Sequence, residues 1–227
     1  MYDEGGRPVA HGFDKDFWER HWQEGRAEGP GSMGGNPPNP YLAREVSGLT
    51  PGTALDAGCG AGAEAIWLAS HGWDVTAADI SSEALARAAR RAAASGASER
   101  VRWVAADLGV WHPDTRFDLV MTHYAHPAMP QLDFYDRIAD WVAPGGTLLI
   151  VGHLHTPEST PHAPDSAGHG HHPPAEASVT SAAITARVDG TEWEIVTAEE
   201  HRRTLTGGGG RTVPLHDVVV RATRRRG

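Results

Sequence analysis

The stretch "ALDAGCGAGAEAIWLA" (residues 54–69) sets three glycines at alternate positions between an apolar run and a helix-like segment. The glycines are Gly58, Gly60 and Gly62, and Asp56 stands two residues before the first of them. Glycine suits such a turn because it accepts backbone angles that other residues avoid and lets a ligand approach the main chain. A strand that feeds a helix through a glycine turn directs backbone N–H groups and a helix N-terminus toward a ligand. The stretch therefore predicts a strand, a ligand-binding turn and a helix in succession.

Strands and helices alternate on either side of this turn. Strands are predicted over 53–58, 74–80, 101–107, 117–124, 145–153, 192–205 and 213–225, and helices over 13–25, 41–49, 62–72, 81–96, 131–145 and 175–188. Repeated strand–helix–strand units need crossover connections, so the sheet is expected to be mainly parallel, with the last two strands as an antiparallel pair. The fold class is therefore α/β.

Composition narrows the classes of partner and the compartment. The chain has 227 residues and a net charge of −9, which disfavours nucleic acid as a partner, although the end "RATRRRG" (221–227) is basic. Cys59 stands alone, so no internal disulfide is expected and the chain fits a reducing cytoplasm. No long apolar run or secretory leader is seen, so we expect no membrane partner. Nothing in the sequence decides the oligomeric state.

Carboxylates follow the next two strands. Asp79 stands seventeen residues after Gly62 at the end of one strand, and Asp107 ends the strand after it. In a doubly wound sheet the first position faces the ribose of a bound nucleotide, where a carboxylate accepts both hydroxyls. A carboxylate or the following backbone at the second position can meet an adenine amino group. These positions predict an adenosine-bearing cofactor.

Two adenosine-bearing cofactors compete for the turn, because residues 58–63 also satisfy the dinucleotide pattern G-x-G-x-x-G/A. A nicotinamide dinucleotide brings a pyrophosphate, which requires a helix N-terminus without acidic groups. S-adenosylmethionine brings a cationic amine and a sulfonium instead. Asp56 at the strand end and Glu64 in the first helical turn suit those cations, so S-adenosylmethionine is the cofactor we expect.

A family resemblance agrees with this choice. The blocks "LDAGCGAG", "VTAADIS", "WVAADL", "FDLVMTHY" and "VAPGGTLLIVGH" resemble, in order and spacing, the core of class I S-adenosylmethionine-dependent methyltransferases. The resemblance implies a Rossmann-like sheet of seven strands, mostly parallel with an antiparallel last strand, and helices on both faces. It assigns the methionine end of the cofactor to Asp56, Gly58, Gly60 and Gly62, the ribose and adenine to Asp79 and Ile80, the adenine edge to Asp107 and Leu108, and the vicinity of the sulfonium to His123 and Tyr124.

The N-terminal segment carries a finer resemblance. "FWERHWQEG" followed by "NPPNPYL" looks like the N-terminal lid of small-molecule methyltransferases of the thiopurine and tellurite-resistance types, in which a Trp-rich helix covers the cofactor. Trp22 is accordingly expected at the cofactor, although packing of Trp18 and Trp22 against the sheet explains the pattern equally well. We expect a lid of helix and loop over 1–40 and a methyltransferase domain over 41–227, which includes a loop rich in His and Pro over 154–174.

Histidines gather where the fourth and fifth strands end. His123, His126, His153 and His155 fall at this edge, and His21 on the lid helix could join them. Neutral imidazole can act as a base near pH 7 or bind a metal. We expect polar lining first, a general base second (His123 or His153), and a metal third. The histidines of 162–172 are dense enough to bind zinc or nickel loosely, but a flexible substrate-entry loop is the interpretation we favour, so no metal is assigned.

The sequence predicts methyl transfer to a small-molecule acceptor by in-line displacement. An NAD(P)-dependent oxidoreductase remains an alternative, although the chain has one lysine, Lys15, and lacks the Tyr-x-x-x-Lys pair of short-chain reductases. A non-catalytic cofactor-binding regulator, or a methyltransferase fold with another activity, also remains open.

Overall fold

The alternation predicted from the sequence is present in the computed structural model, which describes residues 13–24, 37–154, 178–188, 190–206 and 212–227. The strands are β1 (Thr53–Ala57), β2 (Asp74–Asp79), β3 (Val101–Ala105), β4 (Phe117–His123), β5 (Val142–His153), β6 (Trp193–Thr206) and β7 (Thr212–Arg224). The helices are α1 (Lys15–Glu24), α2 (Pro40–Val46), α3 (Ala63–Ser70), α4 (Ser82–Ser95), α5 (Gln131–Ala139) and α6 (Ser181–Thr185), with a 3₁₀ turn at Ser98–Arg100.

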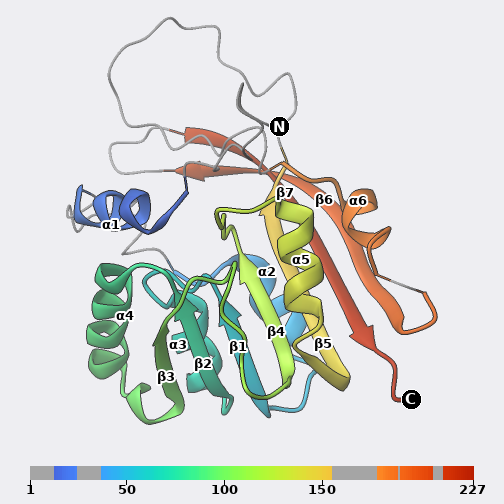
Figure 1. Cartoon of the computed structure of the whole chain (residues 1–227), viewed down its shortest axis with the longest axis horizontal. Helices are drawn as coiled ribbons and strands as arrows, with labels where there is room; N and C mark the ends of the chain where they lie inside the picture. Colours follow the sequence, from blue (N-terminus) through green and yellow to red (C-terminus); the bar gives the residue numbers. More distant parts are fainter. Residues whose placement is uncertain (1–12, 25–36, 155–177, 189, 207–211) are drawn as a thin grey trace, which may run out of the picture.

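The strands form one seven-stranded sheet in the order β3-β2-β1-β4-β5-β7-β6 (Figure 1). Strands β1 to β5 pair in parallel, and β7 lies antiparallel to both of its neighbours. The predicted α/β fold class, a Rossmann-like sheet with an antiparallel last strand, is confirmed. Because parallel strands end at a common edge, the turns that follow β1, β2, β3 and β4 meet there.

Both faces of the sheet are covered by helices, because the central strands carry apolar side chains on both sides. Leu119 and Met121 of β4 pack with α2 and α3 on one face, whereas Phe117 and Val120 pack with α5 and α6 on the other. The change of face from Leu119 to Val120 to Met121 follows from strand geometry, and Phe117 departs from this alternation because the pairing with β5 shifts register between Phe117 and Leu119. In Figure 1 α1 lies apart from both layers, above the edge where β1 and β2 end.

Two predicted helices are shorter in the structure. The helix expected over 131–145 ends at Ala139, and β5, expected over 145–153, begins at Val142. Pro144 and Gly145, whose φ is +82°, do not fit a helix at the end of the predicted span. Within the described part of 175–188, α6 covers Ser181–Thr185. None of the helices in the described ranges is long and apolar enough to cross a membrane.

Candidate cofactor and acceptor site

The glycine turn is held against β2 by its backbone. Gly58 and Cys59 both donate hydrogen bonds to the Ala78 carbonyl, with N–O distances of 2.8 and 3.0 Å. Gly58, Gly60 and Gly62 all have positive φ values, of 84°, 49° and 74°. Other residues rarely adopt these angles, so the turn requires glycine for its conformation as well as for ligand access.

Substitution at two of these glycines would also be blocked by neighbours. A Cβ on Gly58 would lie 2.3 Å from the Ala125 Cβ, and a Cβ on Gly62 would lie 2.6 Å from the Trp103 ring. Gly62 is the N-cap of α3 and its carbonyl accepts the Ile66 N–H. Its role is therefore structural: it brings α3 close to β3.

A cavity of about 320 Å³ opens at the carboxyl ends of the strands, beneath α1. Of the predicted site residues, the cavity is lined by Trp22, Gly58, Gly60, Asp79, Ile80, Asp107, Leu108 and His123. Tyr124 and His126 of the loop after β4 line it as well, with Arg203 of β6. The cavity thus brings these predicted residues together, whereas Asp56, Gly62 and His153 are not among the residues that line it.

The carboxylate of Asp79 stabilises the backbone of the cavity wall. Its Oδ2 accepts the Gly60 N–H at 2.8 Å and its Oδ1 accepts the Ser81 N–H at 2.9 Å. Burial raises the pKa of Asp79 despite these two hydrogen bonds. A ribose hydroxyl would therefore meet a carboxylate whose position is already fixed.

Asp107 lies beyond its strand, because β3 ends at Ala105. Its Oδ1 accepts the Gly109 N–H at 2.8 Å, and its carbonyl accepts the N–H groups of Val110 and Trp111. The carboxylate therefore shapes the turn that presents Leu108 to the cavity.

Asp56 and Glu64 form the acidic floor below the glycine turn. Asp56 is 1 % exposed, and its Oδ2 has no hydrogen-bond partner among the described residues. Burial raises the pKa of Asp56 well above its usual range, and the charges of Glu64 and Asp79 raise it further. A buried carboxylate beside a second one is costly unless a cation approaches. The orphaned oxygen therefore fits a cofactor that carries an amino group. Glu64, which lines the cavity, is the carboxylate such a group would reach.

Helix α1 is fastened over the cavity by Trp22 and Trp18, which the sequence indicated, and by Glu19, which sequence reasoning missed. Glu19 of α1 lies at the N-terminus of α4, where its carboxylate accepts the Ser82 N–H at 2.8 Å and the Ser81 hydroxyl at 3.0 Å. Trp22 is 6 % exposed and packs on Gly60, and its carbonyl accepts Arg87 Nη2 at 2.7 Å. Trp18 donates from Nε1 to the His126 carbonyl at 3.2 Å.

The histidines fall into distinct surroundings. His123 lines the cavity, and both of its ring nitrogens are buried with no hydrogen-bond partner in the described structure. Burial lowers the pKa of His123, so the ring is neutral at pH 7. His153 stacks on Tyr124 at a centroid distance of 4.2 Å and on His126 at 5.9 Å. His21 packs on Phe17, at 5.9 Å.

Two expectations about metal chemistry fall partly outside this structure. His155 and the histidines of 162–172 lie outside the described residues. Within the described ranges, no group of three metal-ligating side chains is close enough to hold an ion.

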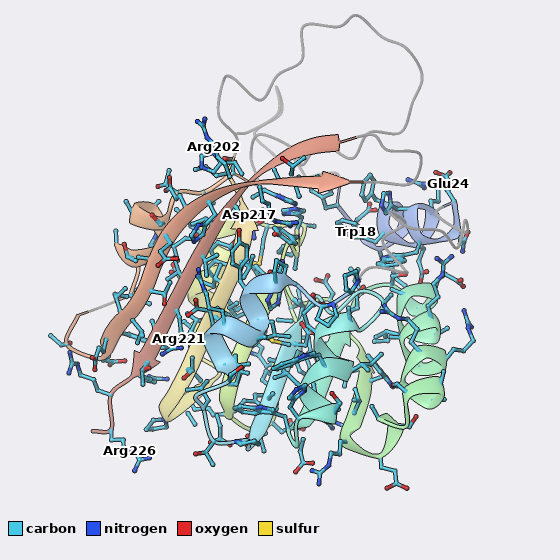
Figure 2. The ribbon with its side chains drawn as sticks, turned by 180° about the vertical axis from the view of Figure 1, so that it is seen from behind. Trp18, Glu24, Arg202, Asp217, Arg221 and Arg226 are labelled. Atoms are coloured by element: carbon cyan, nitrogen blue, oxygen red, sulfur yellow. The ribbon has the colours of Figure 1, made fainter. Side chains whose placement is uncertain are left out.

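On the far wall, Tyr124, which the sequence placed near the sulfonium, is joined by three residues that the sequence prediction missed: Asn39, Arg203 and Asp217. Tyr124 Oη accepts hydrogen bonds from Arg203 Nη2 at 3.0 Å and Asn39 Nδ2 at 3.2 Å. Arg203 also forms an ion pair with Asp217 of β7, which is fully buried. The signal for this pair was the cross-strand register of the last hairpin, which sequence alone leaves undetermined. Figure 2 shows Asp217 on β7 and Trp18 on α1, both toward this end of the molecule.

This sheet order and glycine turn are those of a Rossmann-like methyltransferase fold. Residues 54–146 match the family model of a methyltransferase domain. This match agrees with the resemblance of the sequence to class I S-adenosylmethionine-dependent methyltransferases.

Curated relatives include two methyltransferases with different named acceptors. A probable thiol methyltransferase 2 of Arabidopsis thaliana is 28 % identical over 140 residues, covering 59 % of this chain and 60 % of the relative. A ribosomal RNA small subunit methyltransferase C of Alcanivorax borkumensis is 32 % identical over 119 residues, covering 47 % and 34 %. The chain therefore spans less than two thirds of the length of either relative.

Solved structures share the fold. A structure reported for the conversion of a disulfide bond into a thioacetal group during echinomycin biosynthesis has a TM-score of 0.69 at 21 % identity, covering 93 % of this chain and 91 % of that one. Magnesium protoporphyrin IX methyltransferase from Synechocystis PCC 6803, solved with bound SAH, has a TM-score of 0.60 at 19 % identity, covering 81 % and 80 %.

Proposed function

We propose that this protein transfers the methyl group of S-adenosylmethionine to a small-molecule nucleophile by in-line displacement. The observation that carries the proposal is the acidic floor: Glu64 lines the cavity at the first turn of α3, with Asp56 buried behind it. A cationic amino-acid tail would be stabilised there. The pyrophosphate of a nicotinamide dinucleotide would instead meet a carboxylate at the helix N-terminus.

We assign the cofactor along the strand ends in sheet order. Asp107 and Leu108 after β3 would border the adenine, and Asp79 with Ile80 after β2 would hold the ribose. Gly58 and Gly60 after β1 would border the methionine portion, with His123 near the sulfonium. Trp22 would cover this portion from α1, so residues 1–40 act as the lid of a domain over 41–227.

The cofactor supplies an electrophilic methyl group on a cationic sulfur, and the leaving sulfur becomes neutral. The protein then mainly has to align the nucleophile and exclude water. Orientation of this kind lowers the activation barrier by up to about 7–11 kcal/mol in well-placed systems. A neutral His123 at the cavity could accept a proton from a weakly acidic acceptor. His153, which lies behind Tyr124, could do so only through a change in the ring stack.

A sulfur nucleophile is the first acceptor to test, because a relative is named as a probable thiol methyltransferase. A thiolate also needs little help from a base. The relative named for ribosomal RNA motivates an RNA arm of the same test, although a net charge of −9 is unfavourable for phosphate binding. Location in the cytoplasm stays a prediction.

The deciding experiment incubates the protein with S-adenosylmethionine and panels of thiols, phenols, amines and a structured RNA, and measures S-adenosylhomocysteine. Formation with a small molecule supports the proposal. Tight NADH binding without S-adenosylmethionine binding would reverse the cofactor assignment, and cofactor binding without turnover on any panel would favour a regulator. His123→Ala should lower turnover with cofactor affinity preserved if His123 is the base. An unchanged rate removes it from that role, and the same comparison applies to His153→Ala.

A further inference from the structure

The hydroxyl of Tyr124 is held by two donors from distant parts of the chain. Arg203 Nη2 approaches it at 3.0 Å from β6, and Asn39 Nδ2 approaches it at 3.2 Å from the residue before α2. All three side chains line the cavity. The feature is therefore a polar group in the cavity wall.

The direction of each hydrogen bond is fixed by chemistry. A guanidinium can only donate. Asn39 Oδ1 accepts the Tyr41 N–H at 3.0 Å, so the amide nitrogen of Asn39 is the atom that faces Tyr124. The phenol oxygen thus accepts twice, and its own proton must point to a third group. Among the described residues, the Tyr124 hydroxyl accepts these two hydrogen bonds and donates none.

The sheet order places this proton on the acceptor side of the cavity. Asp107, Asp79 and Gly58 follow β3, β2 and β1, where the adenosine and methionine portions of the cofactor are assigned. Tyr124 follows β4, and Arg203 enters from β6 at the far end of the same sheet. The far side of the sulfonium, where an in-line nucleophile must stand, is bordered by these residues.

Tyr124 is also held in a backbone conformation that few side chains adopt. Its φ is +56°, and no other non-glycine residue of the described structure has a positive φ. Its N–H donates to the Val151 carbonyl at 2.9 Å, and its ring stacks on His153 at 4.2 Å. Strained conformations of this kind persist at sites where a side chain must point in one direction.

The charges around Tyr124 keep it protonated. Burial raises the pKa of Tyr124 and the Asp217 carboxylate on β7 raises it further, whereas the Arg203 cation on β6 and the hydrogen bond from Asn39 oppose the rise. The ring of Tyr124 faces His153 on β5, which in turn stacks on His126 in the loop after β4, and Glu64 of α3 accepts the Asn39 N–H. The phenol is a hydrogen-bond donor at neutral pH, not a base.

We propose that Tyr124 donates a hydrogen bond to the nucleophilic atom of the acceptor, which binds as an anion, and that Arg203 and Asn39 are positioning residues for this donor. The inference rests on the proposed methyl transfer. For a thiol acceptor, the proton is lost to solvent and the thiolate is the bound form. A lone pair of the thiolate sulfur forms the new S–CH₃ bond as the methyl–sulfonium bond breaks, and the electron pair of that bond stays on the leaving sulfur.

The test compares wild type with Tyr124→Phe, which keeps the ring stack on His153. Methylation of thiophenol is measured across pH, and S-adenosylmethionine affinity is measured by calorimetry. Loss of a hydrogen bond to an anion should raise the KM for thiophenol about 10- to 100-fold. The acid limb of the pH profile of kcat should move to higher pH. The reason is that the bound thiol loses the donor that stabilises its thiolate, which raises the pKa of the bound thiol. Cofactor affinity should stay unchanged.

Tyr135→Phe is the matched control, since Tyr135 is buried between α5 and the sheet outside the cavity. It should leave the KM and the pH profile unchanged. In wild type, replacing thiophenol by the less acidic 2-mercaptoethanol should move the acid limb to higher pH, a readout that needs no variant.

Three outcomes overturn the inference. An unchanged acid limb and KM in Tyr124→Phe remove the hydroxyl from the acceptor. An equal loss of S-adenosylmethionine affinity would place the hydroxyl on the cofactor carboxylate. In the third outcome, the acid limb lies at the same pH for both thiols and is lost in His123→Ala. That result would mean that a general base, and not binding of the thiolate anion, governs the pH dependence. Absence of turnover in wild type would instead refute the proposed function itself, and this inference with it.

Discussion

The two sides of the cavity are built in different ways. The adenosyl side (Gly58, Gly60, Asp79 and Asp107) is made of turns that directly follow strands, and it is held by backbone bonds such as that from Gly60 to Asp79, nineteen residues apart. The acceptor side (Asn39, Tyr124 and Arg203) joins residues 85 and 79 positions apart through side chains. Local sequence thus encodes the side expected to bind a shared cofactor, and tertiary packing creates the side expected to choose the acceptor. The difference predicts that substitutions on the adenosyl side weaken cofactor binding, whereas substitutions on the acceptor side change the choice of acceptor.

The largest expected effect is at Gly62. Gly62→Ala should lower the free energy of unfolding by about 2–4 kcal/mol, because a left-handed backbone is strained with a Cβ and this Cβ overlaps the Trp103 ring. Gly96→Ala is the matched control: φ is +73° and no atom lies within 4 Å, so backbone strain alone should cost about 1 kcal/mol. Urea unfolding measures both. Equal losses at the two positions would show that the close approach of α3 to β3 is unimportant.

Next in size is Asp79→Ala, which should weaken S-adenosylmethionine binding by about 1–3 kcal/mol through loss of a charged hydrogen-bond partner. The melting temperature should fall as well, because the N–H groups of Gly60 and Ser81 lose their acceptor. Calorimetric titration and thermal melting provide the two values. Wild-type affinity in the variant would refute the assignment of the ribose to Asp79.

A smaller effect, of opposite sign for stability, is expected at Asp56. Because burial raises the pKa of Asp56 in the folded state, the ionised carboxylate lowers stability once pH rises above the ordinary carboxyl range. Asp56→Asn removes that cost, so it should raise the melting temperature by a few degrees at pH 8 and by less at pH 5. S-adenosylmethionine affinity should increase with pH in wild type, and this dependence should weaken in the variant. A variant that is less stable at both pH values would contradict the electrostatic reading of the acidic floor.

The smallest effect concerns the fastening of α1. Glu19→Gln should cost about 0.3–1 kcal/mol, since a neutral amide interacts less with the N-terminus of α4 than a carboxylate does. Burial acts to raise the pKa of Glu19, but its hydrogen bonds with Ser82, Glu83 and Ser81 together outweigh burial and lower the pKa. The contribution of Glu19 to stability is therefore present above its ordinary pKa and is lost as pH falls through the folded value. Hydrogen exchange should speed up in α1. Glu24→Gln, on the exposed end of the same helix, should change neither the stability nor the hydrogen exchange of α1. If Glu24→Gln has the same effect as Glu19→Gln, the contact between Glu19 and α4 is not what holds α1.

Much of the fold followed from the sequence because its signals are local. Ser81 and Gly96 are the N-cap and C-cap of α4, and they are also the bounds of the helix predicted over 81–96. Pro144 and Gly145 were equally local signals, and they exclude a helix at the end of the span predicted over 131–145, where the structure has β5. A strong breaker at its C-terminal end should have outweighed the helix-like pattern before it.

The residues of the candidate site also divide into those with a local sequence signal and those placed by tertiary packing. Asp79, His123 and the glycines could be placed because each follows a recognisable strand. Asp56 was expected to act on the ligand directly, yet it lies behind Glu64, and which of two carboxylates reaches a cavity depends on packing. Arg203 and Asp217 could not be paired from the sequence, since a one-residue change in hairpin register would face them to opposite sides. Whether the cavity-lining residues bind cofactor stays a prediction.

The hydrogen bonds between Glu19 and the N-terminus of α4 have a consequence for the rate of product release. Lifting α1 to free a spent nucleoside would strip the Ser81 hydroxyl and the Ser82 amide of the carboxylate that now satisfies them. Each turnover would therefore include a step in which the hydrogen bonds of Glu19 with α4 break, and this step is separate from the methyl transfer itself. Solvent viscosity, rather than acceptor reactivity, would then govern the steady-state rate with the fastest acceptors.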